Sequence, residues 1–261
     1  MGNVEKYTTM QTTIIQHLTQ LEETKKIKIL LACETGSRAW GFPSPDSDYD
    51  VRFIYKHHRD WYLQLETPKD DITQMKDEGL IDLSGWDLRK ALLLLKKSNI
   101  SLLERLQSPM IYYAEPTFLE KIQPLAAQHY SRIAALYHYL SMAKNTIAQW
   151  NTLQPLKLKS LFYALRAAVA CQWILEKDNM PPIFFPKMLT SLGIPTHITS
   201  TIETLINLKA TKNEDYWHQW EAELYQFMSA ILQKAEKEAS KLPSAKGKKQ
   251  SLTTFFIETI S

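Results

Sequence analysis

The chain is poor in cysteine and has no long apolar run, and both absences narrow its class. Only two cysteines, Cys33 and Cys171, occur among 261 residues. They are far apart and lie within apolar segments, so they show neither metal-ligand spacing nor a disulfide framework. Apolar runs such as Ala91–Leu95 are far too short to cross a bilayer, and Met1–Lys6 is too polar for a signal peptide. We therefore expect a soluble, cytoplasmic protein with reduced thiols and no membrane partner.

The chain also lacks a strong charge of either sign. Lysine and arginine number 31, aspartate and glutamate number 28, and the net charge is +3. This balance neither demands nor excludes a nucleic-acid partner, so a local basic patch would have to bind one. One candidate is the tail, where lysines form either a solvated surface or a contact to an RNA backbone. These lysines are Lys246, Lys248 and Lys249.

The first third of the chain mixes strand and helix patterns. Residues Val4–Lys26 show helical spacing of apolar residues, and Ile27–Cys33 and Tyr49–Tyr55 show strand patterns. The intervening stretch, Gly36–Ser47, is rich in turn residues. A third strand is expected at Leu80–Leu83. Ser84 then has the sequence signature of a helix cap, with Asp87 completing a capping box.

From about Pro116 onward the strand patterns stop and helical patterns continue. This change predicts an α+β protein with two lobes, a small mixed-sheet lobe followed by an all-helical lobe. The expected boundaries are residues 1–112 for the mixed-sheet lobe, 113–243 for the helical lobe and 244–261 for the tail. The expected helices are Pro116–Tyr130, Ser131–Asn151, Leu156–Asp178, Thr196–Thr211 and Glu214–Lys241.

The segment from Gly36 to Asp50 holds the residues with the clearest chemistry. Gly36 allows the backbone to approach a phosphate closely. Ser37 and the amides after it would lie at a helix N-terminus, which favours an anion. Asp48 and Asp50 are two apart on a strand, so their side chains point the same way. Paired carboxylates suit Mg²⁺, and two such metals can hold both oxygens of an in-line phosphoryl transfer.

This pattern of Gly-Ser, a spacer and Asp-x-Asp resembles the signature of the polymerase-beta nucleotidyltransferase superfamily. The string from Gly36 to Arg52 is similar to one subfamily, the bacterial and phage YcgL-like predicted nucleotidyltransferases proposed to belong to RNA-repair systems. The stretches Ile81–Lys90 and Glu104–Pro109 are similar to that subfamily too. The resemblance covers about the first 110 residues at motif level and the helical part more loosely. It implies that the mixed-sheet lobe, residues 1–112, is a catalytic palm lobe of the polymerase-beta type.

The resemblance implies a third carboxylate on a later strand. Asp82 is the preferred candidate, because it lies within the expected strand Leu80–Leu83. Asp87 is the competitor, but it already has a structural role as the partner of Ser84. Glu34 is either a strand end or a functional neighbour of these carboxylates. Asp48, Asp50 and Asp82 are therefore predicted to be catalytic and to bind Mg²⁺ or Mn²⁺.

The nucleotide is expected to contact residues from both lobes, in the cleft between them. Trp40 stands where some relatives have a second basic residue, so phosphate contacts must come from Arg38, Arg52 or the helical lobe. On the helix Leu156–Asp178 one stripe combines two cations with an aromatic residue, and it should face outward from its own lobe, to water or to the cleft. The stripe consists of Lys159, Tyr163 and Arg166.

The expected reaction is transfer of a nucleoside monophosphate from a nucleoside triphosphate, with ATP favoured, to a hydroxyl. Subfamily resemblance implies an RNA end as the acceptor and RNA as a partner. Two alternatives stay open. One is transfer to a protein side chain or a small molecule, and the other is a nucleotide-binding regulatory module without turnover.

Overall fold

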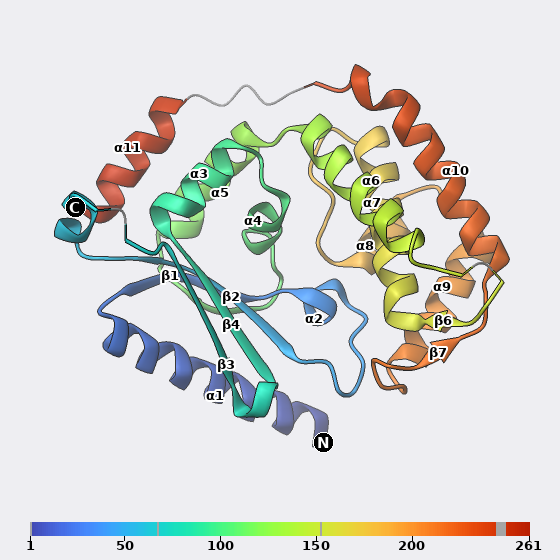
Figure 1. Cartoon of the computed structure of the whole chain (residues 1–261), viewed down its shortest axis with the longest axis horizontal. Coiled ribbons are helices and arrows are strands. Elements are labelled where there is room, and N and C mark those ends of the chain that lie inside the picture. The colour runs from blue at the N-terminus through green and yellow to red at the C-terminus, as the bar shows by residue number, and fades with distance from the viewer. Residues whose placement is uncertain (1, 67, 152, 244–248) are drawn as a thin grey trace. The chain divides into compact units, whose positions relative to one another are not determined.

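The computed structural model describes residues 2–66, 68–151, 153–243 and 249–261, whose contacts divide the chain into two compact units (Figure 1). Unit 1 consists of the described residues of Met1–Gly36, Asp48–His129 and Lys246–Ser261. Unit 2 consists of those of Ser37–Ser47 and Tyr130–Ala245. The chain therefore leaves unit 1 between Gly36 and Ser37 and returns to it between Ser47 and Asp48. The motif segment noted in the sequence is divided between the two units.

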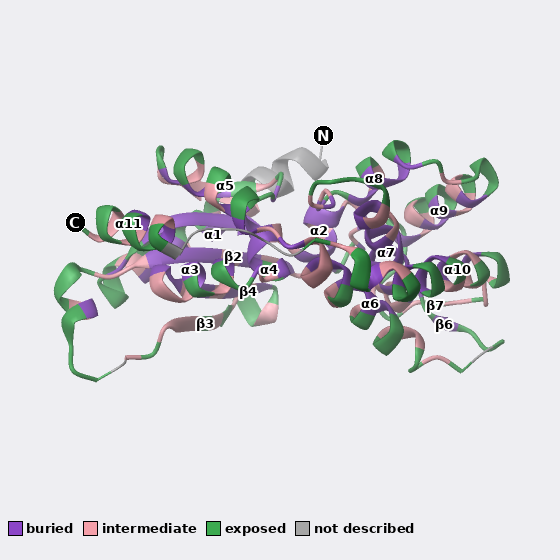
Figure 2. Ribbon diagram, turned by 90° about the horizontal axis from the view of Figure 1, so that it is seen from above, coloured by how far each residue is buried: buried purple, intermediate pink, exposed green. Residues whose placement is uncertain are grey.

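Unit 1 contains a five-stranded mixed sheet in the order β3-β4-β2-β1-β5. Strands β2 and β4 are parallel, and the other neighbouring pairs are antiparallel. The purple strands of Figure 2 show that much of this sheet is buried. The strands are β1 (Lys28–Glu34), β2 (Tyr49–Lys56), β3 (Asp71–Lys76), β4 (Ile81–Asp87) and β5 (Ile111–Ala114).

Alternation along β2 gives the sheet one apolar face and one face with charged residues. Val51, Phe53 and Tyr55 are fully buried in a core cluster with Leu83 of β4. Helix α1 (Gly2–Lys25) covers this face and contributes the apolar residues Ile14, Leu18 and Leu21. Because neighbouring residues on a strand point to opposite faces, Asp50 and Arg52 lie on the other face. The strand expected at Tyr49–Tyr55 is confirmed.

The remaining helices of unit 1 lie on the face with the charged residues, where Figure 1 shows α3, α4 and α5 opposite α1. Helix α11 packs against α3 and α5. The helices are α3 (Leu88–Lys96), α4 (Ile100–Arg105), α5 (Phe118–His129) and α11 (Lys249–Ile260), with short 3₁₀ turns η1 (Arg59–Leu63) and η2 (Asp77–Gly79).

The expected helix cap at Ser84 is wrong. Strand β4 continues past it to Asp87, because residues 81–87 pair along their whole length with β2 and residues 81–86 pair with β3. Asp87 is itself the N-cap of α3, where its carboxylate accepts a hydrogen bond from the Arg89 amide at 2.8 Å. The sequence pattern thus correctly indicated a helix start nearby, but the capping residue is Asp87 and not Ser84.

Unit 2 is helical apart from one two-stranded ladder, β6 (Leu156–Lys157) with β7 (Trp217–His218). The all-helical expectation is therefore corrected by this ladder. In the aromatic core of unit 2, Phe42 stacks on Phe162, with ring centroids 4.8 Å apart. The helices are α2 (Gly36–Trp40), α6 (Arg132–Ile147), α7 (Leu158–Glu176), α8 (Phe185–Ser191), α9 (Thr196–Lys209), α10 (Ala222–Glu238) and the 3₁₀ turn η3 (Ala239–Lys241).

The protein is α+β, as the sequence predicts, with a mixed sheet in one unit and helices dominating the other. The compact units differ from the expected lobes in three places. Helix α11, in the segment expected to be a separate tail, belongs to unit 1. Residues 37–47 pack with the helical unit, and α5 packs with the sheet. No helix within the described ranges is long and apolar enough to cross a membrane.

Candidate active site

Two of the predicted carboxylates face each other across neighbouring strands. Asp50 on β2 is the register partner of Asp82 on parallel β4. Both residues lie on the face away from the core, and about a quarter of each side chain is exposed. Residues opposite each other on adjacent strands lie about 4.8 Å apart in the hydrogen-bonding direction. The structure thus brings together two carboxylates that are 32 positions apart in sequence.

The Arg52 guanidinium lies between these two carboxylates. Its Nη2 is 2.6 Å from Asp50 Oδ1 and 2.8 Å from Asp82 Oδ2. Its Nη1 donates to the main-chain oxygen of Asp82 at 3.0 Å. Arg52 was predicted to contact phosphate. In this structure it is the counter-charge of the carboxylate pair, and its contact with a nucleotide stays a prediction.

Gly36 leaves the space that the Asp50 carboxylate occupies. Its φ is +62°, and a Cβ built on it would lie 2.0 Å from Asp50 Oδ2. Thr35 holds the backbones of residues 35 and 50 together, because its amide and its hydroxyl both donate to the main-chain oxygen of Asp50, at 2.9 and 3.1 Å. The glycine of the Gly-Ser motif is therefore required by the motif's second aspartate.

Glu34 supports Asp50 from a fully buried position at the end of β1. Its Oε1 accepts a hydrogen bond from the Asp50 amide at 2.7 Å, and its Oε2 accepts one from the Tyr112 hydroxyl. The Ser108 hydroxyl donates to the Glu34 main-chain oxygen at 2.6 Å. This network fixes the backbone of Asp50. The sequence indicated Glu34 as a possible neighbour of the carboxylates, but not its contacts with Tyr112 of β5 and Ser108 of the turn before it.

Asp87 differs from Asp82 in face and in environment. The two residues are five apart on β4, so they point to opposite sides of the sheet. Asp87 is fully buried, and the Tyr62 hydroxyl donates to its Oδ2 at 2.7 Å. Burial raises the pKa of the Asp87 carboxyl above its usual value. The geometry therefore favours Asp82 as the partner of Asp50, and Asp48 directly precedes β2, two residues before Asp50.

In unit 2, Ser47 is the centre of a polar cluster around the second half of the motif. The Ser37 hydroxyl donates to Ser47 Oγ at 3.1 Å, and Ser47 donates to Glu214 Oε1 at 2.8 Å. Arg38 donates to the Ser47 main-chain oxygen at 2.6 Å. Lys159 forms an ion pair with the other oxygen of Glu214. Two predicted nucleotide contacts, Ser37 and Lys159, thus belong to one network.

Sequence reasoning missed Glu214 and Lys209 in this cluster. Lys209 is buried, with 2% of its surface exposed, and its Nζ donates to Ser44 Oγ at 2.8 Å. Burial lowers the pKa of its ammonium group. Neither residue belongs to a recognisable motif, and a lysine at the end of a helix pattern is ordinarily a solvated residue. No local signal could have found them.

The stripe on α7 does not face outward as a whole. Arg166 is buried, and its guanidinium lies 4.4 Å from the Trp40 ring centroid. Tyr163 meets the same ring edge-on, with centroids 4.9 Å apart. The expectation of an outward face is wrong for Arg166, because residues 37–47 pack on that side of the helix. Trp40 is a packing residue of the turn, and the nucleotide contacts of the stripe stay predictions.

A preformed metal site is absent from the part of the chain that the structure describes: no three His, Cys, Asp or Glu side chains there are arranged to hold an ion. The chemistry of the carboxylates nevertheless fits a hard divalent cation, since Asp50 and Asp82 offer oxygens on the same sheet face. Arg52 contacts one oxygen of each of these carboxylates.

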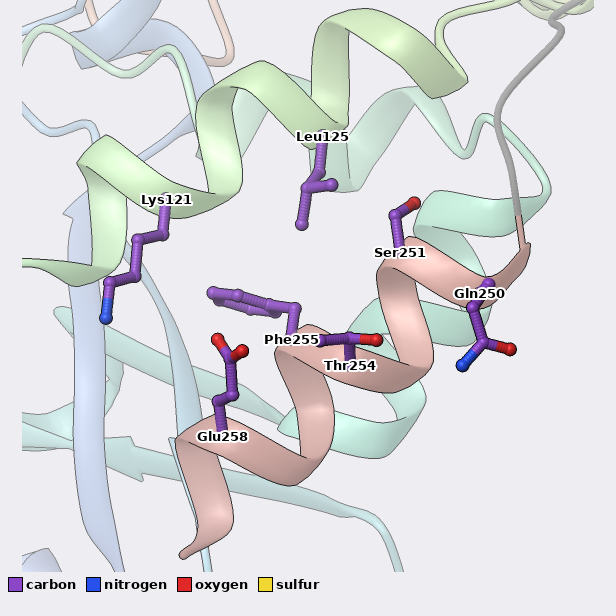
Figure 3. A pocket seen from close by; sticks show the side chains of 7 residues that line it. All are labelled: Lys121, Leu125, Gln250, Ser251, Thr254, Phe255 and Glu258. Atoms are coloured by element: carbon purple, nitrogen blue, oxygen red, sulfur yellow. The ribbon is translucent and has the colours of Figure 1, made fainter.

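A separate pocket of unit 1 lies between α5 and α11 (Figure 3). Lys121 and Leu125 approach it from α5, and Phe255 and Glu258 from α11. None of the predicted site residues lines it. We therefore assign the candidate active site to the carboxylate face of the sheet.

Comparison with known proteins agrees with the class that this sheet and its aspartates define, the polymerase-beta-type nucleotidyltransferases. The RlaP family, described as the RNA repair pathway DNA polymerase beta family, matches residues 10–258. The uncharacterized protein YcgL of Bacillus subtilis (strain 168) is 40% identical over 237 residues, which cover 87% of this chain and 91% of that protein. The chain therefore belongs to the RNA repair pathway DNA polymerase beta family, and the resemblance inferred from its motifs is confirmed.

The solved structures found to be similar include that of a nucleotidyltransferase-like protein from Exiguobacterium sibiricum 255-15. It is 12% identical, covers 89% of this chain and 77% of its own, and has a TM-score of 0.32.

Proposed function

We propose that the protein transfers a nucleoside monophosphate from a nucleoside triphosphate, preferably ATP, to a hydroxyl at an RNA end. The acceptor oxygen bonds to the α-phosphorus, the bond between the α-phosphorus and its bridging oxygen breaks, and pyrophosphate leaves. The observation that carries the proposal is the register of Asp50 and Asp82 on parallel strands, above a glycine that leaves space for the carboxylate. Membership of a nucleotidyltransferase family supports it.

The three aspartates are the residues that would hold the divalent cation, Mg²⁺ or Mn²⁺. When bound by Asp48, Asp50 and Asp82, such a cation supplies positive charge that offsets the phosphates and favours ionisation of the acceptor hydroxyl. Positioning and charge neutralisation carry most of phosphoryl transfer, so no covalent enzyme intermediate is needed.

The other residues of the site position these groups. Glu34 fixes the Asp50 amide, and Gly36 leaves room for the Asp50 carboxylate. We assign triphosphate contacts to Ser37, Arg38 and Arg52, and to the stripe of unit 2. Lys159 is the member of the stripe with the most accessible charge, since 38% of its side chain is exposed.

An RNA end is the acceptor that the description of the family supports. Asp82 would act at the acceptor, by holding the metal that activates its hydroxyl and by helping to take its proton.

Labelled ATP tests the proposal and separates the acceptors. The protein is incubated with Mg²⁺ or Mn²⁺ and with separate pools of RNA, protein and metabolites, using ATP labelled at either the α- or the γ-phosphate. We expect α-label, but no γ-label, in the RNA pool. Transfer of γ-label would indicate a kinase, and α-label in another pool would change the acceptor.

Matched variants identify the site in the same assay. Asp50→Asn should abolish transfer without unfolding the protein. Asp77→Asn is the control, because it removes the same charge from a side chain of unit 1 that is 40% exposed and pairs with His17. No label in any pool with the unmutated protein would favour a nucleotide-binding regulatory module.

A further inference from the structure

The Arg52 guanidinium lies between the carboxylates of Asp50 and Asp82, where a divalent cation that bridges them would also lie. One nitrogen, Nη2, contacts an oxygen of Asp50 at 2.6 Å and an oxygen of Asp82 at 2.8 Å. A divalent cation bound between the two strands would bind the same two carboxylates, because carboxylate oxygens are its preferred ligands. The guanidinium and the metal therefore compete for one set of ligands.

The carboxylates of Asp50 and Asp82 need a positive charge beside them whether or not a metal is bound. Asp50 and Asp82 are register partners on adjacent strands, and like charges directly opposite each other in a sheet are destabilising. Their side chains are only about a quarter exposed, so water screens the repulsion incompletely. Arg52 stands two residues after Asp50 on the same face and supplies the missing positive charge.

The guanidinium is held by contacts that can be exchanged. Besides the two carboxylates, it donates to the Asp82 main-chain oxygen at 3.0 Å and to the Val51 main-chain oxygen at 3.4 Å. The side chain is long and 18% exposed. Its planar fork also suits phosphate oxygens. Release from the carboxylates would therefore leave a group able to bind the triphosphate.

We propose that Arg52 is an internal substitute for the metal, which neutralises Asp50 and Asp82 in the metal-free protein and is displaced when the cation binds. This inference rests on the proposed function, since it concerns the same carboxylates. It gives Arg52 two successive roles, first as counter-ion of the aspartates and then as a phosphate contact. Metal binding would be weak until Arg52 moves, so that metal and nucleotide bind cooperatively.

Binding of Mn²⁺ without nucleotide tests the inference. Free Mn²⁺ is measured by its electron paramagnetic resonance signal during titration of the unmutated protein and of Arg52→Gln. Removing the competing cation should tighten Mn²⁺ binding about tenfold, which corresponds to about 1.4 kcal/mol. A residue that merely stabilises the strands would leave the Mn²⁺ affinity unchanged or weaken it.

Two controls make the result specific. Arg59→Gln removes the same charge from an exposed residue of unit 1 and should leave Mn²⁺ affinity unchanged. Asp50→Asn should abolish the binding. If Arg52→Gln does not fold, Arg52→Lys retains the charge but lacks the second arm that bonds the Asp82 main chain. It should hold the carboxylates less firmly and still bind Mn²⁺ more tightly than the unmutated protein.

The outcomes distinguish this inference from the proposed function. Equal Mn²⁺ affinities in the unmutated protein and the Arg52 variants, together with loss of binding in Asp50→Asn, would overturn the inference and leave the proposed metal site intact. Absence of Mn²⁺ binding in every protein, including the Arg52 variants, would overturn both. Tighter binding that is confined to the Arg52 variants supports the substitution of the metal by Arg52.

Discussion

The change Gly36→Ala tests whether the glycine of the motif exists to accommodate Asp50. An alanine Cβ would lie 2.0 Å from Asp50 Oδ2, and real Cβ contacts are essentially never under 3.0 Å. The carboxylate must therefore move by about 1 Å. A displacement of about 1 Å at a reacting group costs roughly 100-fold in rate, or about 2.7 kcal/mol in the activation free energy. We expect this loss in nucleotidyl transfer.

The same change also strains the backbone, because φ at Gly36 is +62°. Residues other than glycine pay about 1–2 kcal/mol in this region, which should lower the free energy of unfolding. Gly79→Ala provides the matched control. Its φ is +94°, but the nearest atom to an added Cβ is Met75 Cε at 4.0 Å. It should therefore lose stability and keep its activity.

A double-mutant cycle isolates the clash from the strain. In an Asp50→Ala background the carboxylate is gone, so Gly36→Ala should destabilise the protein by the backbone term alone. Chemical denaturation gives the free energies, and single-turnover transfer gives the rates. The reasoning is refuted if Gly36→Ala transfers nucleotide at the parental rate while losing only as much stability as Gly79→Ala.

Three further predictions concern unit 2 and the tail. Lys159→Ala and Arg166→Ala should each raise the Michaelis constant for ATP, by an amount that corresponds to about 1.5–3 kcal/mol of binding free energy. Arg166→Ala should also lower the melting temperature, because Arg166 packs on Trp40. Nucleotide titrations of these variants that overlay the titration of the unmutated protein would contradict this prediction. Burial lowers the pKa of Lys209 in the folded state, so the folded protein binds this proton less tightly than the unfolded chain. Stability should therefore rise as pH increases through the window between the folded pKa and the unfolded value of about 10.4. Lys209→Met should remove that rise, and an identical pH dependence in melting curves would contradict it. Neutralising Lys246, Lys248 and Lys249 of the tail should weaken RNA binding and reduce its salt dependence, while nucleotide binding is unchanged. Unchanged RNA affinity would assign these lysines to the solvated surface. Lys246 and Lys248 lie outside the described residues, and the side chain of Lys249 is not described.

Elements with a strong period were predictable from the sequence. Helices α5, α6, α7 and α9 lie within their expected ranges, because an apolar stripe repeats along each of them. Strand β2 was predicted because apolar and polar residues alternate along it. Strand β3 was missed, because DITQMK is a polar edge strand whose pairing with β4 is visible only in three dimensions.

In the candidate site, too, some residues could be predicted from local sequence patterns, and the contacts of others depend on the tertiary structure. The pair Asp48 and Asp50 could be read from a local motif, and Asp82 from its apolar neighbours on a strand. The bridge made by Arg52 depends on the register of two strands that are about 30 residues apart, which no local pattern encodes. The burial of Arg166 likewise depends on residues 37–47, far away in sequence.

The central claim is that nucleotidyl transfer takes place on the face of the sheet that carries Asp50 and Asp82. Two aspartates of β4 test it, because Asp82 lies on that face and Asp87 lies on the other. Transfer of α-labelled nucleotide should be lost in Asp82→Asn, with a nearly unchanged melting temperature. Asp87→Asn should remain active and lose about 1 kcal/mol or less of stability, since asparagine can still cap α3. An active Asp82→Asn beside an inactive but folded Asp87→Asn would contradict the account.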